Sequence, residues 1–274
     1  MDRVVFGSSN SMNVAQLPLP RWEADLHGDD RDLKHLTQHF TGDGLRIYEE
    51  AVTGQTLMVI EGFPANTNHG EVLAAALEKA KVLSGVLMVA RQSQKPLSVG
   101  GVMLRQVDGK RYVYTTIHET LRVHADFHTQ VLRRDSNGHL VPVPQPPPLT
   151  VTLAALAQTD PVVATAMRLR VMPDAGTWRG LVPLFEVIDH DVMRTGSSVV
   201  KKGWASAKQQ KRFEHTANSS AAGDASRHGH ERWAAPKNPM TLDEAQSFVQ
   251  MVMHAWIADR IAQSSTADSN LSNP

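Results

Sequence analysis

The sequence predicts an α+β protein, in which a strand-rich N-terminal domain with one long helix precedes a C-terminal bundle of four to five helices. In the first half, apolar residues alternate with polar ones in short runs separated by glycine-containing turns, which is the period of strands. In the second half, apolar residues recur every three to four positions, which is the period of helices. Between residues 142 and 148 a run of prolines predicts a domain boundary, because dense proline continues neither helix nor sheet.

Composition excludes several kinds of site. The chain has 274 residues, enough for two domains, and its 28 Lys and Arg balance its 28 Asp and Glu, so any attraction to nucleic acid has to be local. Without cysteine it can form no disulfide, thiolate zinc site or cysteine nucleophile. Neither a secretory signal nor an apolar stretch of membrane-spanning length is visible, so we expect a cytoplasmic protein that does not enter a membrane.

The N-terminal domain is expected over residues 41–140, after a loosely structured segment at 1–40. Proline breaks regular structure in that segment, and an acidic stretch leads into a short helix at 33–40. The first pair of strands is predicted on either side of Thr53-Gly54, because apolar residues alternate there at Leu45, Ile47, Leu57 and Val59.

A second hairpin is predicted from 99–104 and 112–117, joined by Asp108-Gly109, a dipeptide that favours tight hairpin turns. Between the two hairpins, residues 71–89 show helical spacing of apolar side chains. We expect this amphipathic helix to pack on the sheet, so that the first domain consists of strands and one long helix.

Residues 115–131 carry polar side chains at alternate positions, which predicts one polar face of a strand: His118, His124, Asp126 and His128. Strand residues four positions apart are roughly 13 Å apart, too far for His124 and His128 to share a metal ion. This face is therefore interpreted as solvated.

A proline-rich linker at 141–148 leads to the helical bundle at 149–262. Asp160-Pro161 caps a helix and fills its first position, and Thr177 is expected to cap the next one. Thr241 and Glu244 have the spacing of a capping box at the start of the last helix. The polar tail at 263–274 is predicted to be disordered.

The loop before the last helix gathers the groups most able to do chemistry. Residues 200–240 contain eight Lys or Arg and only three Asp or Glu, in a chain whose total charge is zero. In Arg227-His228, a fixed cation able to hold a phosphate stands beside an imidazole able to move a proton. RNA cleavage needs only these two functions, since the ribose 2′-hydroxyl supplies the nucleophile.

A helical bundle with an arginine and a histidine at the junction of its last two helices resembles the HEPN superfamily, whose name stands for higher eukaryotes and prokaryotes nucleotide-binding. Joined to a strand-rich N-terminal domain, it also resembles some bacterial abortive-infection proteins of that group. The family signature is an arginine, often followed by asparagine or another polar residue, then four to six residues and a histidine. This chain departs from it, because His215 follows Arg212 too soon, and His228 and His230 follow Arg227 too soon.

The resemblance implies an RNA-binding protein or metal-independent endoribonuclease of bacterial antiviral defence or stress, dimeric through the bundle and without a cofactor. In this chain, Arg227 and His228 come closest to the catalytic arginine and histidine of the family. The expected substrate-binding residues are Arg212, His215, Asn218 and His230.

Two alternatives stay open. The same basic loop could belong to a non-catalytic interaction module that binds a nucleotide or an acidic protein partner. His215, Asp224, His228 and His230 could also form a zinc site, but without cysteine or a helical His-x-x-x-His pattern we expect no metal.

Overall fold

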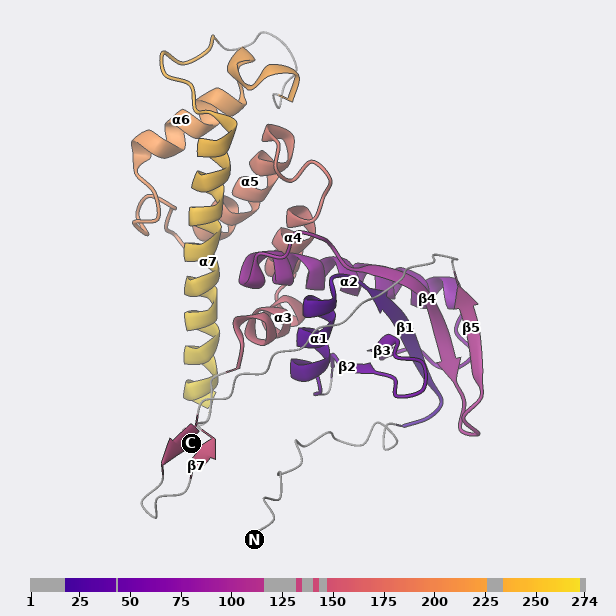
Figure 1. Cartoon of the computed structure of the whole chain (residues 1–274). Coiled ribbons are helices and arrows are strands. Elements are labelled where there is room, and N and C mark those ends of the chain that lie inside the picture. Colours follow the sequence, from indigo (N-terminus) through magenta and orange to yellow (C-terminus); the bar gives the residue numbers. More distant parts are fainter. Residues whose placement is uncertain are drawn as a thin grey trace. The chain divides into compact units, whose positions relative to one another are not determined.

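The computed structural model describes residues 18–42, 44–115, 132–134, 140–142, 147–225 and 234–271. It is an α+β structure, as predicted, with a five-stranded antiparallel sheet followed by helices (Figure 1). The chain divides into two compact units, Met1–Ala80 with Leu97–Pro146, and Lys81–Pro96 with Pro147–Pro274. The sequence analysis placed the whole helix at 71–89 in the first domain, whereas this division falls within that helix, after Ala80.

The sheet of the first unit has the strand order β2-β3-β1-β4-β5, with all neighbouring strands antiparallel. Its strands are β1 (Arg21–His27), β2 (Ile47–Glu49), β3 (Thr56–Ile60), β4 (Ser98–Arg105) and β5 (Arg111–Thr115). Both predicted hairpins are confirmed, β2 with β3 and β4 with β5. Gly54 and Gly109 adopt φ values of 68° and 80° in the two turns, a conformation that glycine reaches without strain.

The prediction of a loosely structured segment at 1–40 is wrong for the part that the structure describes. β1 is the middle strand of the sheet, and α1 (Asp30–His39) follows it. Asp29 caps α1 by accepting a hydrogen bond from the Arg31 amide. The alternation of Trp22, Ala24 and Leu26 is a strand signal, but the charged residues between them hid it, because charged side chains usually indicate a solvated segment.

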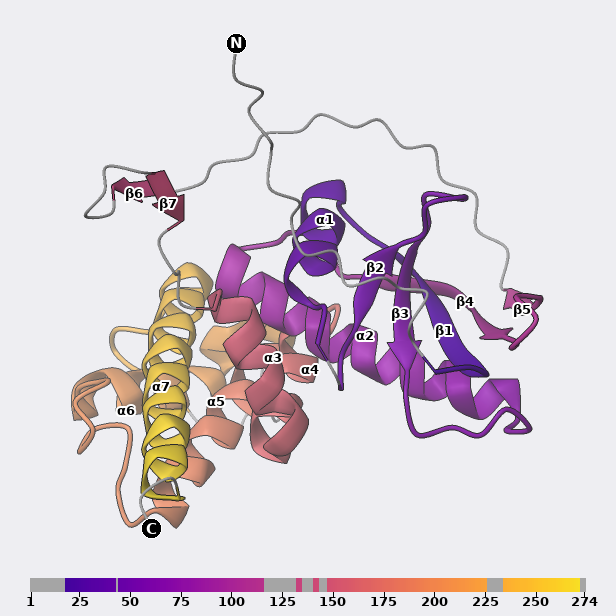
Figure 2. The same ribbon diagram turned by 90° about the horizontal axis from the view of Figure 1, so that it is seen from below.

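The N-terminal half of α2 (His69–Arg91) lies across one face of the sheet (Figure 2). On this face Tyr114 of β5 stacks on His69, with ring centroids 4.4 Å apart, and tilts against Trp22 at 5.9 Å. Trp22 is 2% exposed and donates from its indole nitrogen to the Pro64 carbonyl at 3.0 Å. The predicted packing of this helix on the sheet is therefore confirmed for its first half.

The opposite face of the sheet carries a row of three arginines. Arg21, Arg105 and Arg111 stand directly opposite one another on β1, β4 and β5. Like charges at facing positions repel, so the row needs counter-charges. Glu23 and Glu50 supply two of them, and their side chains are 0% and 8% exposed.

Each of these glutamates binds at least two groups of the network. Glu23 accepts from Arg21 Nε at 2.6 Å, from Tyr48 Oη at 2.5 Å and from Arg105 Nε at 3.0 Å. Burial, followed by the charge of Glu23, raises the pKa of Tyr48 to about 12, so the phenol stays a donor. Glu50 accepts from Arg105 Nη2 at 2.8 Å and from both terminal nitrogens of Arg111. This ion network ties three strands to the end of β2.

The helices of the second unit are those predicted in number and order. They are α3 (Leu149–Thr159), α4 (Pro161–Arg170), α5 (Trp178–Arg194), α6 (Ala207–Ala217) and α7 (Leu242–Leu271), with a short 3-10 helix η2 (Ser220–Ala225) after α6. No single helix among the described residues is long and apolar enough to cross a membrane, although α3 and α4 would meet that test as a pair bent by 120°.

All three predicted helix starts are confirmed, and a side chain caps two of them. Asp160 accepts from the amides of Val162 and Val163 at the start of α4. Thr241 and Glu244 form the predicted capping box of α7. Thr177 precedes α5, but its hydroxyl donates backwards to the Asp174 carbonyl at 2.8 Å, so it does not cap the helix with its side chain.

α7 packs against α3 and α5 and is held to them by buried polar groups. Asp191 of α5 accepts from the indole nitrogen of Trp256 at 2.8 Å and from Arg260 at 3.0 Å. Arg260 also reaches Asp160, the cap of α4, at 2.8 Å. α7 continues to Leu271, so the prediction of disorder from residue 263 is wrong as far as that residue.

The predicted linker lies only partly within the described residues. Two short strands, β6 (Leu132–Arg134) and β7 (Leu140–Pro142), form an antiparallel pair, and β7 includes the first two residues of the predicted linker. The predicted polar strand face with His118, His124, Asp126 and His128 falls outside the described residues.

Candidate functional site

The candidate site is the chain between α6 and α7, where sequence analysis placed six functional residues. The structure describes Arg212, His215 and Asn218, which all belong to α6 or its C-terminal cap. Arg227, His228 and His230 lie outside the described residues. The described residues of α6 and of the start of α7 hold the two ends of this segment, and we call them the frame.

Arg212 forms the first part of that frame. Its guanidinium donates to the carbonyls of Asn238 at 3.0 Å and Pro239 at 2.8 Å, and it pairs with both carboxylate oxygens of Glu244, at 3.2 and 2.8 Å. These bonds join α6 to the segment that enters α7 and to the capping box itself. The same donors cannot hold a phosphate while they are engaged in this way.

Glu244 serves two partners at once. The hydrogen bond from the Thr241 amide, and then the bond from Arg212, lower the pKa of Glu244 below its ordinary value. The carboxylate is therefore charged at neutral pH, as both the helix cap and the ion pair require.

His215 and Thr216 fix the returning chain one turn further along α6. The His215 ring nitrogen Nε2 lies 3.0 Å from the Ala234 carbonyl, and the Met240 amide donates to the Thr216 hydroxyl at 3.0 Å. His215 Nε2 must carry the proton to donate to a carbonyl.

Asn218 is the C-terminal cap of α6. Its side-chain nitrogen donates to the Glu214 carbonyl at 2.9 Å, while its Oδ1 is buried and has no hydrogen-bond partner among the described residues. The outgoing chain then passes through η2, which contacts α5 and α6. Both ends of the 226–233 segment are thus attached to α6, one through η2 and the other through His215.

An aromatic cluster beneath the frame sets the spacing of the helices. Phe213 of α6 lies between Phe248 of α7 and Phe185 of α5, with ring centroids 5.2 and 5.1 Å away, and Trp178 lies at 5.7 Å. Phe213 is 1% exposed. Tilted ring pairs at these distances are favourable and directional, so α6 is fixed in rotation as well as in distance.

Basic side chains surround the frame. Lys201, Lys208, Lys211 and Lys237 are exposed. Exposed lysines near a loop attract phosphate without restricting its path, because the ammonium is a flexible point charge. The Lys202 ammonium, in contrast, is held by Asp259 of α7 at 2.9 Å.

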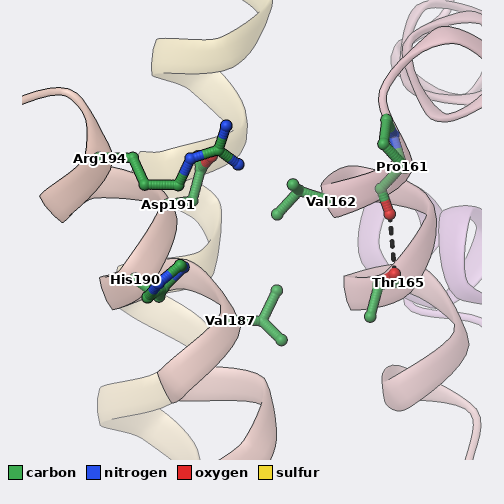
Figure 3. A pocket seen from close by; sticks show the side chains of 7 residues that line it. All are labelled: Pro161, Val162, Thr165, Val187, His190, Asp191 and Arg194. Carbon is green, nitrogen blue, oxygen red and sulfur yellow. Dashed lines mark hydrogen bonds between the residues drawn. The ribbon is translucent and has the colours of Figure 1, made fainter.

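Sequence analysis missed a second arginine and histidine pair, which lines a cavity of about 300 Å³ between α4 and α5. His190 and Arg194 are exposed and stand one helical turn apart on α5. Figure 3 shows Val162 of α4 and Val187 of α5 facing each other across this cavity. The spacing of four residues was visible in the sequence, but nothing there indicated that α4 would form the opposite wall.

Among the described residues, no group of three or more His, Asp or Glu side chains could hold a metal ion. Of the four residues considered for zinc, the side chains of Asp224, His228 and His230 lie outside the described part.

Comparisons of the chain with models of protein families, with curated proteins and with solved structures gave no match. The resemblance to the HEPN superfamily therefore stays a prediction.

Proposed function

We propose that this protein binds RNA and cleaves it without a metal ion, through Arg227 and His228 in the segment between α6 and α7. The supporting observation is that His215 and Arg212 of one helix hold the chain on the far side of that segment, at Ala234 and at Asn238 to Glu244. Anchoring both ends of a short segment reduces the conformational entropy that it must lose when it orders around a substrate.

In this proposal Arg227 holds the non-bridging oxygens of the scissile phosphate, and a histidine acts as the base. The ribose 2′-hydroxyl gives its proton to the His228 imidazole and its oxygen attacks phosphorus. The bond from phosphorus to the 5′-oxygen breaks, and that oxygen takes a proton from a protonated imidazole. The products are a 2′,3′-cyclic phosphate and a 5′-hydroxyl, and no oxidant, reductant or metal is required.

The two proton transfers need a base and an acid. We propose a homodimer through the helical bundle, which would bring two copies of the segment together and supply the second imidazole. His230 of the same segment is the other source of that group. Within this scheme the exposed lysines guide the RNA, while Arg212 and His215 hold the segment and do not contact the substrate.

The alternative is a non-catalytic module that binds a nucleotide or an acidic protein through the same basic surface. His228→Ala separates the two functions. A nuclease loses turnover by a factor of about 100 or more and keeps its affinity for RNA, since a general base contributes to the rate and little to ground-state binding.

A docking surface behaves in the opposite way. Its affinity falls with the paired change Lys208→Ala and Lys211→Ala and decreases steeply with salt, while His228→Ala leaves it unchanged. RNA binding by fluorescence anisotropy at two salt concentrations, beside cleavage of the same RNA on a gel, distinguishes these outcomes. Binding without any cleavage would rule out the enzymatic part of the proposal.

A further inference from the structure

A second cavity of about 210 Å³ lies in the helical unit, away from the segment between α6 and α7. Its walls come from the C-terminal half of α2, the end of α4, the start of α5 and the middle of α7. From α7 it receives the residues at 246, 249, 250, 253 and 254, which form one stripe along the helix. It therefore occupies a site where four segments of the same unit meet.

The floor of this cavity is apolar. Leu184, Val249 and Met253 are each at most 3% exposed, and Val89 and Leu181 are also buried. Met88 and Met253 are unbranched and polarizable, so they adapt to the shape of a guest. Among the described residues that line the cavity, none is phenylalanine, tyrosine or tryptophan.

The rim is polar and carries charge of one sign. Arg170, at the end of α4, is its permanent cation, and His254 of α7 adds an imidazole that can donate a hydrogen bond. Gln246 closes one side by donating to the Gly176 carbonyl at 2.7 Å. No aspartate or glutamate is among the lining residues that the structure describes, so the electrostatic complement is a single negative charge at the mouth.

We infer that this cavity binds a small apolar monocarboxylate, with its hydrocarbon body on the floor and its carboxylate at Arg170 and His254. Size supports this class of ligand, because a dry cavity of about 150 Å³ holds one benzene ring, and this one is somewhat larger. Benzoate combines such a ring with a carboxylate and is a suitable probe. The inference does not depend on RNA cleavage, and its test involves no RNA.

The experiment is a titration of the full-length protein with benzoate, followed by NMR of methionine methyl groups labelled with carbon-13. The Met88 and Met253 signals, assigned by Met→Leu substitution at each position, shift saturably with a dissociation constant on the order of a millimolar or tighter. Benzamide has the same shape without the charge and binds about tenfold more weakly, because it cannot form a charge-assisted bond with the guanidinium.

Three variants locate the site. Arg170→Gln weakens benzoate about tenfold and leaves benzamide unchanged, whereas Arg179→Gln, at an exposed arginine outside the cavity, changes neither. Gln250→Trp places a large side chain at an exposed rim position, where folding is unaffected, and blocks both ligands. Equal binding of benzoate and benzamide, an unchanged affinity in Arg170→Gln, or no saturable shift of either methyl would overturn the inference.

Discussion

Arg212 of α6 and Glu244 of α7 form a two-pronged ion pair, with nitrogen to oxygen distances of 3.2 and 2.8 Å. The same guanidinium binds two backbone carbonyls, and the same carboxylate caps α7. A single pair of side chains therefore fixes where the segment between the two helices ends.

Replacing this arginine should loosen the junction without removing apolar packing. Arg212→Met keeps a long, helix-favouring side chain but loses the donors to the Asn238 and Pro239 carbonyls. We expect the free energy of unfolding to fall by about 1–3 kcal/mol, the usual range for hydrogen bonds from charged donors. Urea denaturation measures the loss, and hydrogen exchange at the Met240 amide should accelerate.

Lys211→Met is the matched control, since Lys211 is an exposed neighbour on the same helix. It should change stability by less than about 0.5 kcal/mol. Equal effects of the two substitutions would mean that the junction does not depend on Arg212.

The ion network of the sheet predicts that a nearly isosteric substitution at Glu23 strongly lowers the free energy of unfolding. Glu23→Gln preserves the shape of the side chain but removes a fully buried negative charge between Arg21 and Arg105. Breaking a buried ion pair on one side costs about 3–5 kcal/mol, because the remaining charge stays desolvated. Chemical denaturation should show this loss, while Glu61→Gln, at an exposed position, stays within about 0.5 kcal/mol of the parent protein.

Glu50 makes the stability of the sheet depend on pH. Burial by itself would raise its pKa, but hydrogen bonds from Arg105, Thr53 and Arg111 lower it below the ordinary value of 4.5. A group whose pKa is depressed in the folded state stabilises the protein above its unfolded pKa and loses that contribution as the pH falls through the folded value.

The parent protein should therefore be more stable than Glu50→Gln at neutral pH, and the difference should shrink as the pH falls below 4.5. Urea midpoints of both proteins from neutral pH to below this value test the linkage. A difference that stays constant over the whole range would show that the ion pairs of Glu50 do not control it.

At Gly85 of α2 we expect alanine to lower the stability of the protein, although helix propensity alone favours alanine over glycine. A Cβ at this position of α2 would lie 2.3 Å from the Met167 carbonyl oxygen of α4, where backbone cannot easily move. In an open helix, Gly→Ala stabilises by up to about 1 kcal/mol. Here Gly85→Ala should destabilise by about 1–3 kcal/mol, through overpacking. A raised melting temperature would contradict this close approach of the two helices.

The turns and helix starts could be predicted from the sequence, because local interactions determine them. Thr53-Gly54 and Asp108-Gly109 specified both hairpins, and Asp160 and Thr241 specified helix starts, because turns and caps involve residues only a few positions apart. Thr177 precedes α5 as predicted, but its hydroxyl donates to the Asp174 carbonyl and accepts no bond from the first amides of the helix.

Long-range pairing produced the errors. β1 was missed because Glu23 is buried beside Arg105, a partner 82 residues away that the sequence does not reveal. The contacts of Arg212 at the junction were likewise not predicted, because its partners lie 26 to 32 residues further along the chain. The cavity beside His190 and Arg194 depends in the same way on α4, which no motif connects to α5.

The most direct test of the central proposal is to incubate the protein with labelled total and transfer RNA in EDTA. The parent protein should cleave, leaving 2′,3′-cyclic phosphate ends, and Arg227→Ala with His228→Ala should abolish cleavage while circular dichroism shows an intact fold. His190→Ala with Arg194→Ala removes the same residue types from α5 and should leave cleavage unchanged. Intact RNA with the folded parent protein, or cleavage lost only in the α5 pair, would contradict the account.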